Sequence, residues 1–394
     1  MERKKNNCAA RHERRCLRLL IAAGGTGGHV YPAIAIAQKV RACRPDAEIL
    51  FVGTRDRLEA RAVPRSGFSL GFITVKGLAA TRPALQRLGA LLWLASGAPL
   101  WQSILLLARF RPHVVVGTGG FVCGPVLLAA RLLRVPSLAV ELNEIPGLTT
   151  RITARFVSAA AVVSEACRGR YIRLLGRKAP RVRVEVVGTP LRQEIISTRR
   201  EDAARALGLD PSRLTLLVFG GSIGSLPVNK AFGQALGILA RRPGMGEVEI
   251  VHITGRGNAP CLTAAQADEL GLRYHPFEYR DDMHNALAAA DIAVSRAGGS
   301  TLAEITARSL AAIIVPWSGA AERHQELNAA HLETAGAALV IRDSELTPQR
   351  LADAIWLLLS DTAAREQLAR QSLMMSKRDA ADAVVRMIED LARR

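Results

Sequence analysis

One unit occurs twice along this 394-residue chain: a short apolar run stops at paired glycines and is followed by a stretch with helical periodicity. The first copy is IAAGGTGGHVYPAI at residues 21–34, and the second begins as TLLVFGGSIGS at residues 215–225. Such a strand–turn–helix unit leaves free amides at the helix start, which favour an anion. The repetition predicts two Rossmann-like domains that face each other.

Strand-like runs alternate with helical stretches through both halves of the chain. This alternation is typical of an α/β fold in which helices cover both faces of a parallel sheet. Aromatic residues make up only 4% of the chain, and this disfavours a β-sandwich. Further strands are predicted at 47–54, 72–75, 113–120, 137–142, 159–164, 182–190, 247–255, 291–299, 311–317 and 337–343.

The length suits two domains of ordinary size. We expect a basic tail over 1–16, because the apolar run that follows it is short and ends in glycines, unlike a signal peptide. The first domain is predicted over 17–190 and the second over 205–360, with a charged linker between them. Helices over 361–394 are expected to pack back towards the first domain.

The charge balance favours anionic partners. The chain has 53 Lys and Arg against 35 Asp and Glu, a formal net charge of +18. No basic run interleaved with aromatic residues and no zinc-finger spacing occurs in the sequence, so nucleic acid is not an expected partner. Six scattered cysteines without a CxxC pair predict reduced thiols.

Residues 88–108 form an uncharged segment between two arginines. Its length would permit a membrane span, but its position between two strands favours two helical pieces broken near Pro99. Trp93 and Trp101 lie close to basic residues in the sequence. The segment is therefore interpreted either as core helices or as a patch that faces a membrane surface.

Two glycine turns in the first half point to one cleft. The GGTGGH turn ends at His29, and a second turn, GTGGFVCGP, occupies residues 117–125. Ligands of open α/β sheets bind at the carboxyl edge, so turns at neighbouring strand ends would line the same cleft. His29 is suited to proton chemistry, although a helix-start histidine bonded to local backbone explains it equally well.

The second half contains two further candidate loops. GGSIG (220–224) repeats the phosphate-binding pattern, and SRAGGSTLAEI (295–305) predicts a helix that starts at Ser300 or Thr301. Glu304 would then lie in the first turn, where it either completes a capping box with Thr301 or accepts hydrogen bonds from ribose hydroxyls.

Two further groups of polar residues in the second half each have two interpretations. Gln325 and Asn328 either reach sugar hydroxyls or belong to a polar helix start. The pair Asp281 and Asp282 is better explained as a solvated helix start than as a metal site.

The ordered motifs GGTGGH, GTGGFVCGP, ELN, VVGTPLR, GGSIG, RDDM, SRAGGSTLAEI and HQELNA resemble the MurG family from about Leu17 to Arg342. Members of that family transfer N-acetylglucosamine from its UDP sugar to lipid-linked muramyl-pentapeptide in peptidoglycan synthesis. The resemblance implies a GT-B fold with a cleft between two domains. It also implies UDP-GlcNAc as substrate, no cofactor or metal, and a peripheral position on the anionic, cytoplasmic face of the membrane.

The resemblance implies an inverting displacement in which a base, His29 or Glu141, removes a proton from the acceptor's 4-hydroxyl. Departing UDP would be stabilised by helix-start amides and an arginine. The implied donor-binding residues are Thr26, Gly27, Gly28, Asn143, Arg192, Ser222, Arg280, Gly299, Ser300, Thr301, Leu302, Ala303, Glu304 and Gln325.

The chain departs from the family pattern where VELN (140–143) stands in place of HEQN, Thr189 in place of the asparagine of NPxR, and His324 in place of a glutamine. These losses affect acceptor recognition more than the UDP-sugar site. The alternatives are a relative that uses UDP-GlcNAc with another acceptor or as an epimerase, and a UDP-sugar binder without catalysis. A dehydrogenase is disfavoured, since Gly53-Thr54-Arg55 offers no ribose-binding acid after the second strand.

Overall fold

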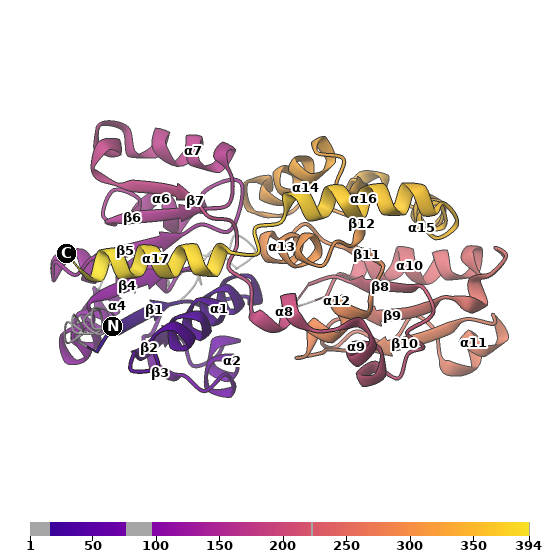
Figure 1. Cartoon of the computed structure of the whole chain (residues 1–394), viewed down its shortest axis with the longest axis horizontal. Helices are drawn as coiled ribbons and strands as arrows, with labels where there is room; N and C mark the ends of the chain where they lie inside the picture. The colour runs from indigo at the N-terminus through magenta and orange to yellow at the C-terminus, as the bar shows by residue number, and fades with distance from the viewer. Residues whose placement is uncertain (1–15, 76–96, 222–223, 394) are drawn as a thin grey trace, which may run out of the picture.

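The computed structural model describes residues 16–75, 97–221 and 224–393. The basic tail up to residue 15, Trp93 and Ser222 therefore lie outside the described residues, and no prediction about them is tested. Of the predicted tail, only Cys16 is described. The chain forms two domains that lie side by side along the long axis of the molecule (Figure 1).

The first domain is built on a parallel, seven-stranded sheet with the order β3-β2-β1-β4-β5-β6-β7. Its central strands are fully buried, because helices cover both faces. The strands are β1 (Arg18–Ala22), β2 (Glu48–Gly53), β3 (Ser69–Phe72), β4 (Val114–Gly117), β5 (Ser137–Val140), β6 (Ala159–Val162) and β7 (Arg183–Val186).

Two groups of helices cover this sheet. One face carries α1 (Gly27–Cys43), α2 (Glu59–Arg65) and α17 (Ala380–Ala392). The other carries α4 (Ala98–Phe110), α5 (Cys123–Leu132), α6 (Leu148–Thr153) and α7 (Glu165–Leu175), with the 3-10 helix η1 (Gly176–Arg181) before β7.

The second domain repeats the plan with a parallel, six-stranded sheet in the order β10-β9-β8-β11-β12-β13. The chain crosses once between neighbouring β8 and β11, so this sheet has the same switch in strand order that the first has between β1 and β4. The strands are β8 (Thr215–Phe219), β9 (Glu249–Ile253), β10 (Arg273–Phe277), β11 (Ile292–Ser295), β12 (Ala311–Ile314) and β13 (Leu339–Val340).

The helices of the second domain also form two layers. One contains α8 (Gln193–Ser197), α9 (Arg200–Leu207), α12 (Met283–Ala289), α13 (Gly299–Ala307) and α14 (His324–Thr334). The other contains α10 (Leu226–Leu239), α15 (Pro348–Ser360) and α16 (Thr362–Met375). The remaining elements are α11 (Ala264–Glu269) and the 3-10 helices η2 (Met245–Glu247), η3 (Ala321–Arg323) and η4 (Asp343–Glu345).

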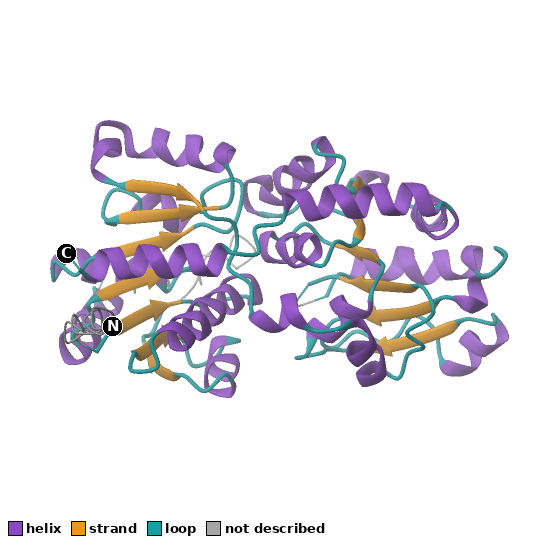
Figure 2. Cartoon of the chain, in the orientation of Figure 1, coloured by secondary structure: helices purple, strands orange, loops and turns teal. Residues whose placement is uncertain are grey.

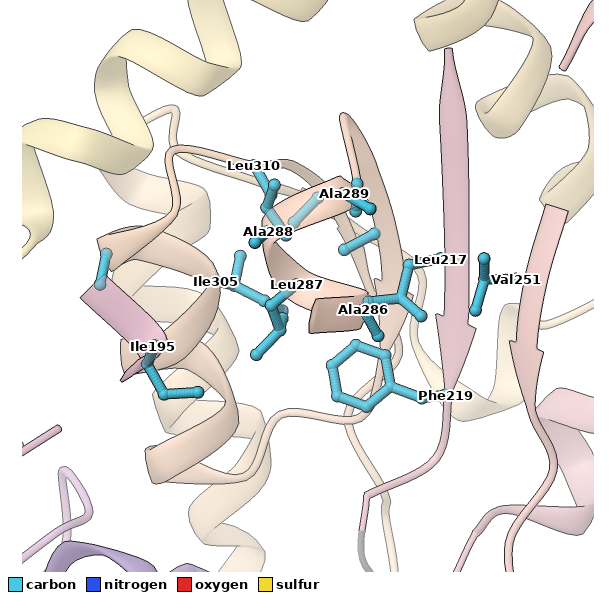
Figure 3. Packing of buried hydrophobic residues seen from close by; sticks show 14 of the residues in the cluster. Ile195, Leu217, Phe219, Val251, Ala286, Leu287, Ala288, Ala289, Ile305 and Leu310 are labelled. Carbon is cyan, nitrogen blue, oxygen red and sulfur yellow. The ribbon is translucent and has the colours of Figure 1, made fainter. Parts of the chain in front are cut away.

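The domains are joined by two crossings. The first follows β7, and α8 and α9 then pack on α12 through Ile195, Ala203 and Ala204 (Figure 3). The stretch expected to be a linker is therefore part of the second domain's core. At the second crossing the chain leaves α16, which packs on α13, and α17 returns to lie along α1 (Figure 1).

The carboxyl ends of both sheets point towards the middle of the molecule (Figure 2). The glycine loops that follow β1, β4, β8 and β11 therefore lie where the two domains meet. Each pair of loops flanks the switch in strand order, which is the usual ligand position in an open α/β sheet.

One local prediction differs from the structure, and another is tested only in part because residues 76–96 lie outside the described residues. The strand expected at 72–75 lies earlier, at Ser69–Phe72, where it pairs with β2. Part of the uncharged segment forms α4, which begins at Ala98 with Pro99 in its first turn, a position that needs no amide. Among the described residues, no helix is both long and apolar enough to cross a membrane.

Candidate functional site

The two glycine turns of the first domain are in contact. β1 and β4 are paired neighbours, and an added Cβ on Gly120 would lie 2.2 Å from the Gly24 carbonyl oxygen. The left-handed φ of Gly120, +81°, also disfavours a side chain. The buried Glu59 carboxylate holds the first turn from behind, because it accepts hydrogen bonds from Gly25 N and Thr54 N. Together these contacts present the start of α1 to the cleft.

His29 lies in the first turn of α1 in a defined tautomer. Its Nδ1 donates to the Thr118 carbonyl oxygen at 3.0 Å, so Nε2 carries the lone pair when the ring is neutral. Burial lowers the pKa of His29, whereas the nearby Glu141 carboxylate raises it, and lowering prevails. The ring is therefore neutral near pH 7, as a general base requires.

Gly119 determines where the His29 ring lies. Its φ is +105°, and an added Cβ would be 2.5 Å from His29 Nδ1. We expect Gly119→Ala to lower turnover by about tenfold to a hundredfold, since a displacement of about 1 Å at a catalytic group has effects of this size. Steady-state kinetics test this, with UDP affinity expected to stay unchanged.

Gly147→Ala is the matched control for that substitution. Gly147 has open space around its Cα and a φ of −65°, which alanine adopts readily. Its turnover should equal that of the parent protein. If Gly119→Ala were equally active, the ring position would not matter for catalysis.

Glu141 is buried, and its hydrogen bonds organise the loop after β5. One carboxylate oxygen accepts from Leu142 N and Asn143 N, and the other accepts from Gly147 N and from the Thr150 hydroxyl at 2.6 Å. The Glu141 carboxylate is thus committed to holding this loop, because both its oxygens already accept hydrogen bonds from residues 142–150. The geometry therefore favours His29 as the base and a positioning role for Glu141.

We expect Glu141→Ala to destabilise the protein by about 3 kcal/mol, because it leaves buried donors without partners. The melting temperature should fall by about 5–10 °C, as calorimetry would show. Glu165→Ala is the control, because Glu165 is 74% exposed and an exposed ion pair contributes little. Loss of turnover with an unchanged melting temperature would instead assign Glu141 the role of base.

Asn143 and Asn328 join the two domains. Asn328 is buried; its Oδ1 accepts from Glu144 N, and its Nδ2 donates to Asn143 Oδ1 and to the Ala297 carbonyl. Asn143 Nδ2 in turn donates to Glu141. The polar atoms of Asn328 are thus already paired, which favours domain contact over the sugar binding suggested by the sequence.

The start of α13 lies against the first domain. An added Cβ on Gly299 would be 1.9 Å from the Leu142 carbonyl oxygen, and one on Gly28 would be 3.5 Å from the Ser300 hydroxyl. The helix starts of α1 and α13 therefore converge across the domain interface. Two such starts combine their partial positive charges, an arrangement suited to an anionic ligand.

The capping box suggested by the sequence is absent. α13 begins at Gly299, earlier than expected, with Gly298 as the N-cap and no side-chain cap bond. Glu304 consequently lies in the second turn. Leu302 N already donates to the Gly298 carbonyl, so the amides left free for a ligand are those of Gly299, Ser300 and Thr301.

The Glu304 side chain makes no hydrogen bond or ion pair to the described residues, whereas its backbone carbonyl accepts from Arg308 N within the helix. Burial raises the pKa of this carboxyl to about 7, and the charge of Arg192 opposes the rise. Arg192 itself stacks on the Tyr31 ring, with its Cζ 4.6 Å from the ring centroid. A half-buried carboxylate without a side-chain partner, beside an arginine, is poised to accept hydrogen bonds from a ligand.

The other implied donor residues are less directly placed. Gln325 Oε1 accepts from Ala297 N and Trp317 N, so it ties the α13 and β12 loops together. Thr26 is the exposed N-cap of α1, and Gly27 is buried behind it. Leu302 belongs to the second domain's core, and Ala303 packs against that core.

The acidic pair after β10 is neutralised by arginines. Arg280 binds Asp282 through both carboxylate oxygens and lowers the pKa of Asp282 to about 2. Asp281 forms an ion pair with Arg65 of the first domain at 2.6 Å. Within the described part of the chain, no cluster of three metal-binding side chains occurs. Arg280 thus serves its own loop in this structure.

Sequence reasoning missed an aromatic contact across the cleft. The hydroxyls of Tyr31, on α1, and Tyr279, after β10, lie 3.2 Å apart. Arg256 stacks on Tyr279 from the other side, 3.9 Å from the ring centroid. The only indication of this contact in the sequence is the position of Tyr31, two residues after His29 at the start of the helix that faces the cleft.

Comparisons with known proteins agree with this geometry. Residues 19–162 match the glycosyltransferase family 28 N-terminal domain, and residues 215–384 match its C-terminal domain. The UDP-N-acetylglucosamine--N-acetylmuramyl-(pentapeptide) pyrophosphoryl-undecaprenol N-acetylglucosamine transferase of Desulforudis audaxviator is 40% identical over 382 residues, which cover 95% of this chain and 99% of the relative. The chain belongs to the MurG family. A relative of the same name from Symbiobacterium thermophilum is 39% identical over 380 residues, 96% of this chain and 97% of the relative.

The GT-B fold of the MurG family is also found by structure. The crystal structure of MurG from Acinetobacter baumannii superposes with a TM-score of 0.68 at 23% identity, over 95% of this chain and 99% of that one. Leu142, which stands where the MurG motif has glutamine, is buried in the first domain's core, and its carbonyl meets α13. The replacement of glutamine by Leu142 thus lies at a position that packs in the core, whereas Glu141 and Asn143 keep their polar contacts.

Proposed function

We propose that this protein transfers N-acetylglucosamine from UDP-GlcNAc to the 4-hydroxyl of muramyl-pentapeptide linked to pyrophosphoryl-undecaprenol. The observation that carries the proposal is the contact between α1, which holds His29 in its base-competent tautomer, and the start of α13, the helix that carries Glu304. Nearly full-length similarity to transferases of that name supports the same substrates.

The site suggests a direct displacement with inversion at the anomeric carbon. His29 Nε2 takes the proton of the attacking hydroxyl as the new glycosidic bond forms. The bond to UDP breaks at the same time, and the leaving diphosphate gathers negative charge. The free amides of Gly299, Ser300 and Thr301, with Arg192, stabilise that charge. No step in this scheme requires a metal or a cofactor.

Two surfaces of the first domain support contact with an anionic membrane. On α4, Trp101 and Leu105 are 62% and 45% exposed. At the amino edge of the sheet, a pocket is lined by the arginines Arg131, Arg134, Arg155 and Arg181, which have no carboxylate partner among the described residues. Apolar side chains and arginines of this kind bind the interface of anionic bilayers.

An assay with purified lipid-linked muramyl-pentapeptide and labelled UDP-GlcNAc tests the activity. We expect the label to appear in the lipid fraction in step with UDP release. UDP release without labelled lipid would contradict the proposed acceptor. Conversion of UDP-GlcNAc to its epimer would show that the protein acts as an epimerase and would contradict the proposed transfer.

Sedimentation with vesicles tests the membrane contact. Vesicles rich in anionic phospholipid should bind the protein, and zwitterionic vesicles should bind it weakly. Trp101→Ser and Arg134→Glu should each reduce the bound fraction. Equal binding to both vesicle types by the parent and both variants would contradict a specific anionic surface.

A further inference from the structure

Three buried side-chain nitrogens in the second domain have no hydrogen-bond partner in the described chain: Arg192 Nε, His284 Nδ1 and Arg308 Nε. Arg308 follows the end of α13, whereas the other two lie at helix starts. Arg192 precedes the first turn of α8, and His284 lies in the first turn of α12. A buried polar atom without a partner costs free energy. At a cleft, such an atom is best explained by a ligand that supplies the missing hydrogen bond.

The packing of three helices brings these groups together with Glu304. Ile195 of α8, Leu287 of α12 and Ile305 of α13 belong to one buried cluster (Figure 3). α12 and α13 begin from the loops that follow β10 and β11 at the carboxyl edge of the second sheet. α8 begins from the crossing that follows β7, and it contacts both other helices. The polar groups at the starts of these helices therefore face the same part of the cleft.

The charges of these residues interact. Burial lowers the pKa of His284, and the Arg192 charge lowers it further. The same Arg192 charge opposes the raised pKa of Glu304. The other charges near His284 are those of Asp282, Glu194 and Arg280, and Arg280 and Asp282 are already paired with each other. His284 and Glu304 thus share Arg192 as a charged neighbour, and burial together with the Arg192 charge favours a neutral His284 ring.

The donor and acceptor properties of the three groups define what they can bind. Arg192 Nε only donates, ionised Glu304 only accepts, and one nitrogen of a neutral histidine can accept a hydroxyl proton. A phosphate offers acceptors only and cannot satisfy Glu304. A vicinal diol offers two donors and several lone pairs, so it satisfies all three.

We propose that His284 is a further donor-binding residue that completes recognition of the ribose diol of the nucleotide. One hydroxyl donates to Glu304 and the other donates to His284 Nδ1, while Arg192 Nε–H donates to one of the two oxygens. This inference rests on the proposed function, because it takes the ligand to be a uridine diphosphate sugar. It assigns a ribose contact to a residue outside the motifs that carry the resemblance.

Calorimetric titration with UDP, 2′-deoxy-UDP and 3′-deoxy-UDP tests the inference. We expect His284→Ala to weaken UDP binding about tenfold, the effect of one good hydrogen bond. One deoxy analogue should bind parent and variant equally well, because the hydroxyl that His284 holds is missing from it. His284→Asn, whose amide can replace Nδ1, should recover most of the affinity.

Steady-state kinetics and a control complete the test. The KM for UDP-GlcNAc should rise in His284→Ala while kcat stays near the parent value, and His331→Ala, an exposed histidine on α14, should change neither. Parent-like UDP affinity in His284→Ala, or equal losses for all three nucleotides, would overturn the inference. If Glu304→Gln still weakened UDP binding, the proposed function would stand. A parent protein that binds no UDP would overturn both.

Discussion

Replacing His29 with alanine is expected to lower the rate of sugar transfer by about 10²- to 10⁴-fold, the contribution typical of a positioned general base. The UDP affinity should change little, because His29 belongs to the first domain and the nucleotide groups to the second. Single-turnover kinetics beside calorimetric titration of UDP separate the two effects. Selective loss of the chemical step would place His29 at the acceptor hydroxyl.

The pH profile adds a second readout. Burial lowers the pKa of His29 below the ordinary histidine value of 6.5, so the free base persists across neutral pH and the parent rate should fall only on the acid side of that value. That acid limb should disappear in the residual activity of His29→Ala. His331→Ala should keep both rate and profile. A fully active His29→Ala variant would exclude His29 as the base and would agree with a sugar binder that lacks this chemistry.

The second large effect is expected at Glu304. Glu304→Gln should weaken UDP binding by about tenfold to a hundredfold, because a charged hydrogen bond contributes about 1.5–3 kcal/mol. Glutamine also places an amide donor where the ribose offers donors. Titration with UDP measures the loss, and Glu333→Gln on α14, whose side chain is 40% exposed, is the control.

The affinity for UDP should also depend on pH through Glu304. Its pKa is about 7 in the unliganded protein, and only the ionised carboxylate binds the ribose hydroxyl as a charged acceptor. Affinity should therefore rise with pH, by about tenfold between pH 6 and pH 8, since the ionised fraction changes by that factor. Glu304→Gln should lose this dependence. An affinity that falls as pH rises would contradict the assignment of Glu304.

Much of the fold follows from the sequence because the strands of a parallel sheet are continuous apolar runs that end at glycine turns. β1, β4, β8 and β11 all have this form, and the structure shows that each pair flanks a switch in strand order. β10 was missed because RYHPF at the sheet edge is polar and contains a proline, which edge strands tolerate. The sequence predicts a linker at α8 and α9 because a charged run interrupts the apolar pattern there, and the few apolar residues that the two helices bury give only a weak helical periodicity.

The site was harder to predict where contacts cross between domains. The sequence suggested a role for Asn328, but its partners Glu144 and Asn143 lie 184 and 185 residues away. Within the first domain, the distinction between Glu141 as base and as loop organiser depends on five donors of residues 142–150 that the folded loop turns towards its carboxylate. His284 carries no motif, and only its buried, unpaired nitrogen identifies it.

A crystal structure of the protein with UDP-GlcNAc bound is the most direct test of the central claim that both halves of the site act on one donor. We predict the ribose hydroxyls against Glu304, the diphosphate at the amides of Gly299 to Thr301, and the anomeric carbon on the side that faces His29. A nucleotide bound elsewhere, with Glu304 far from the ribose, would contradict this account.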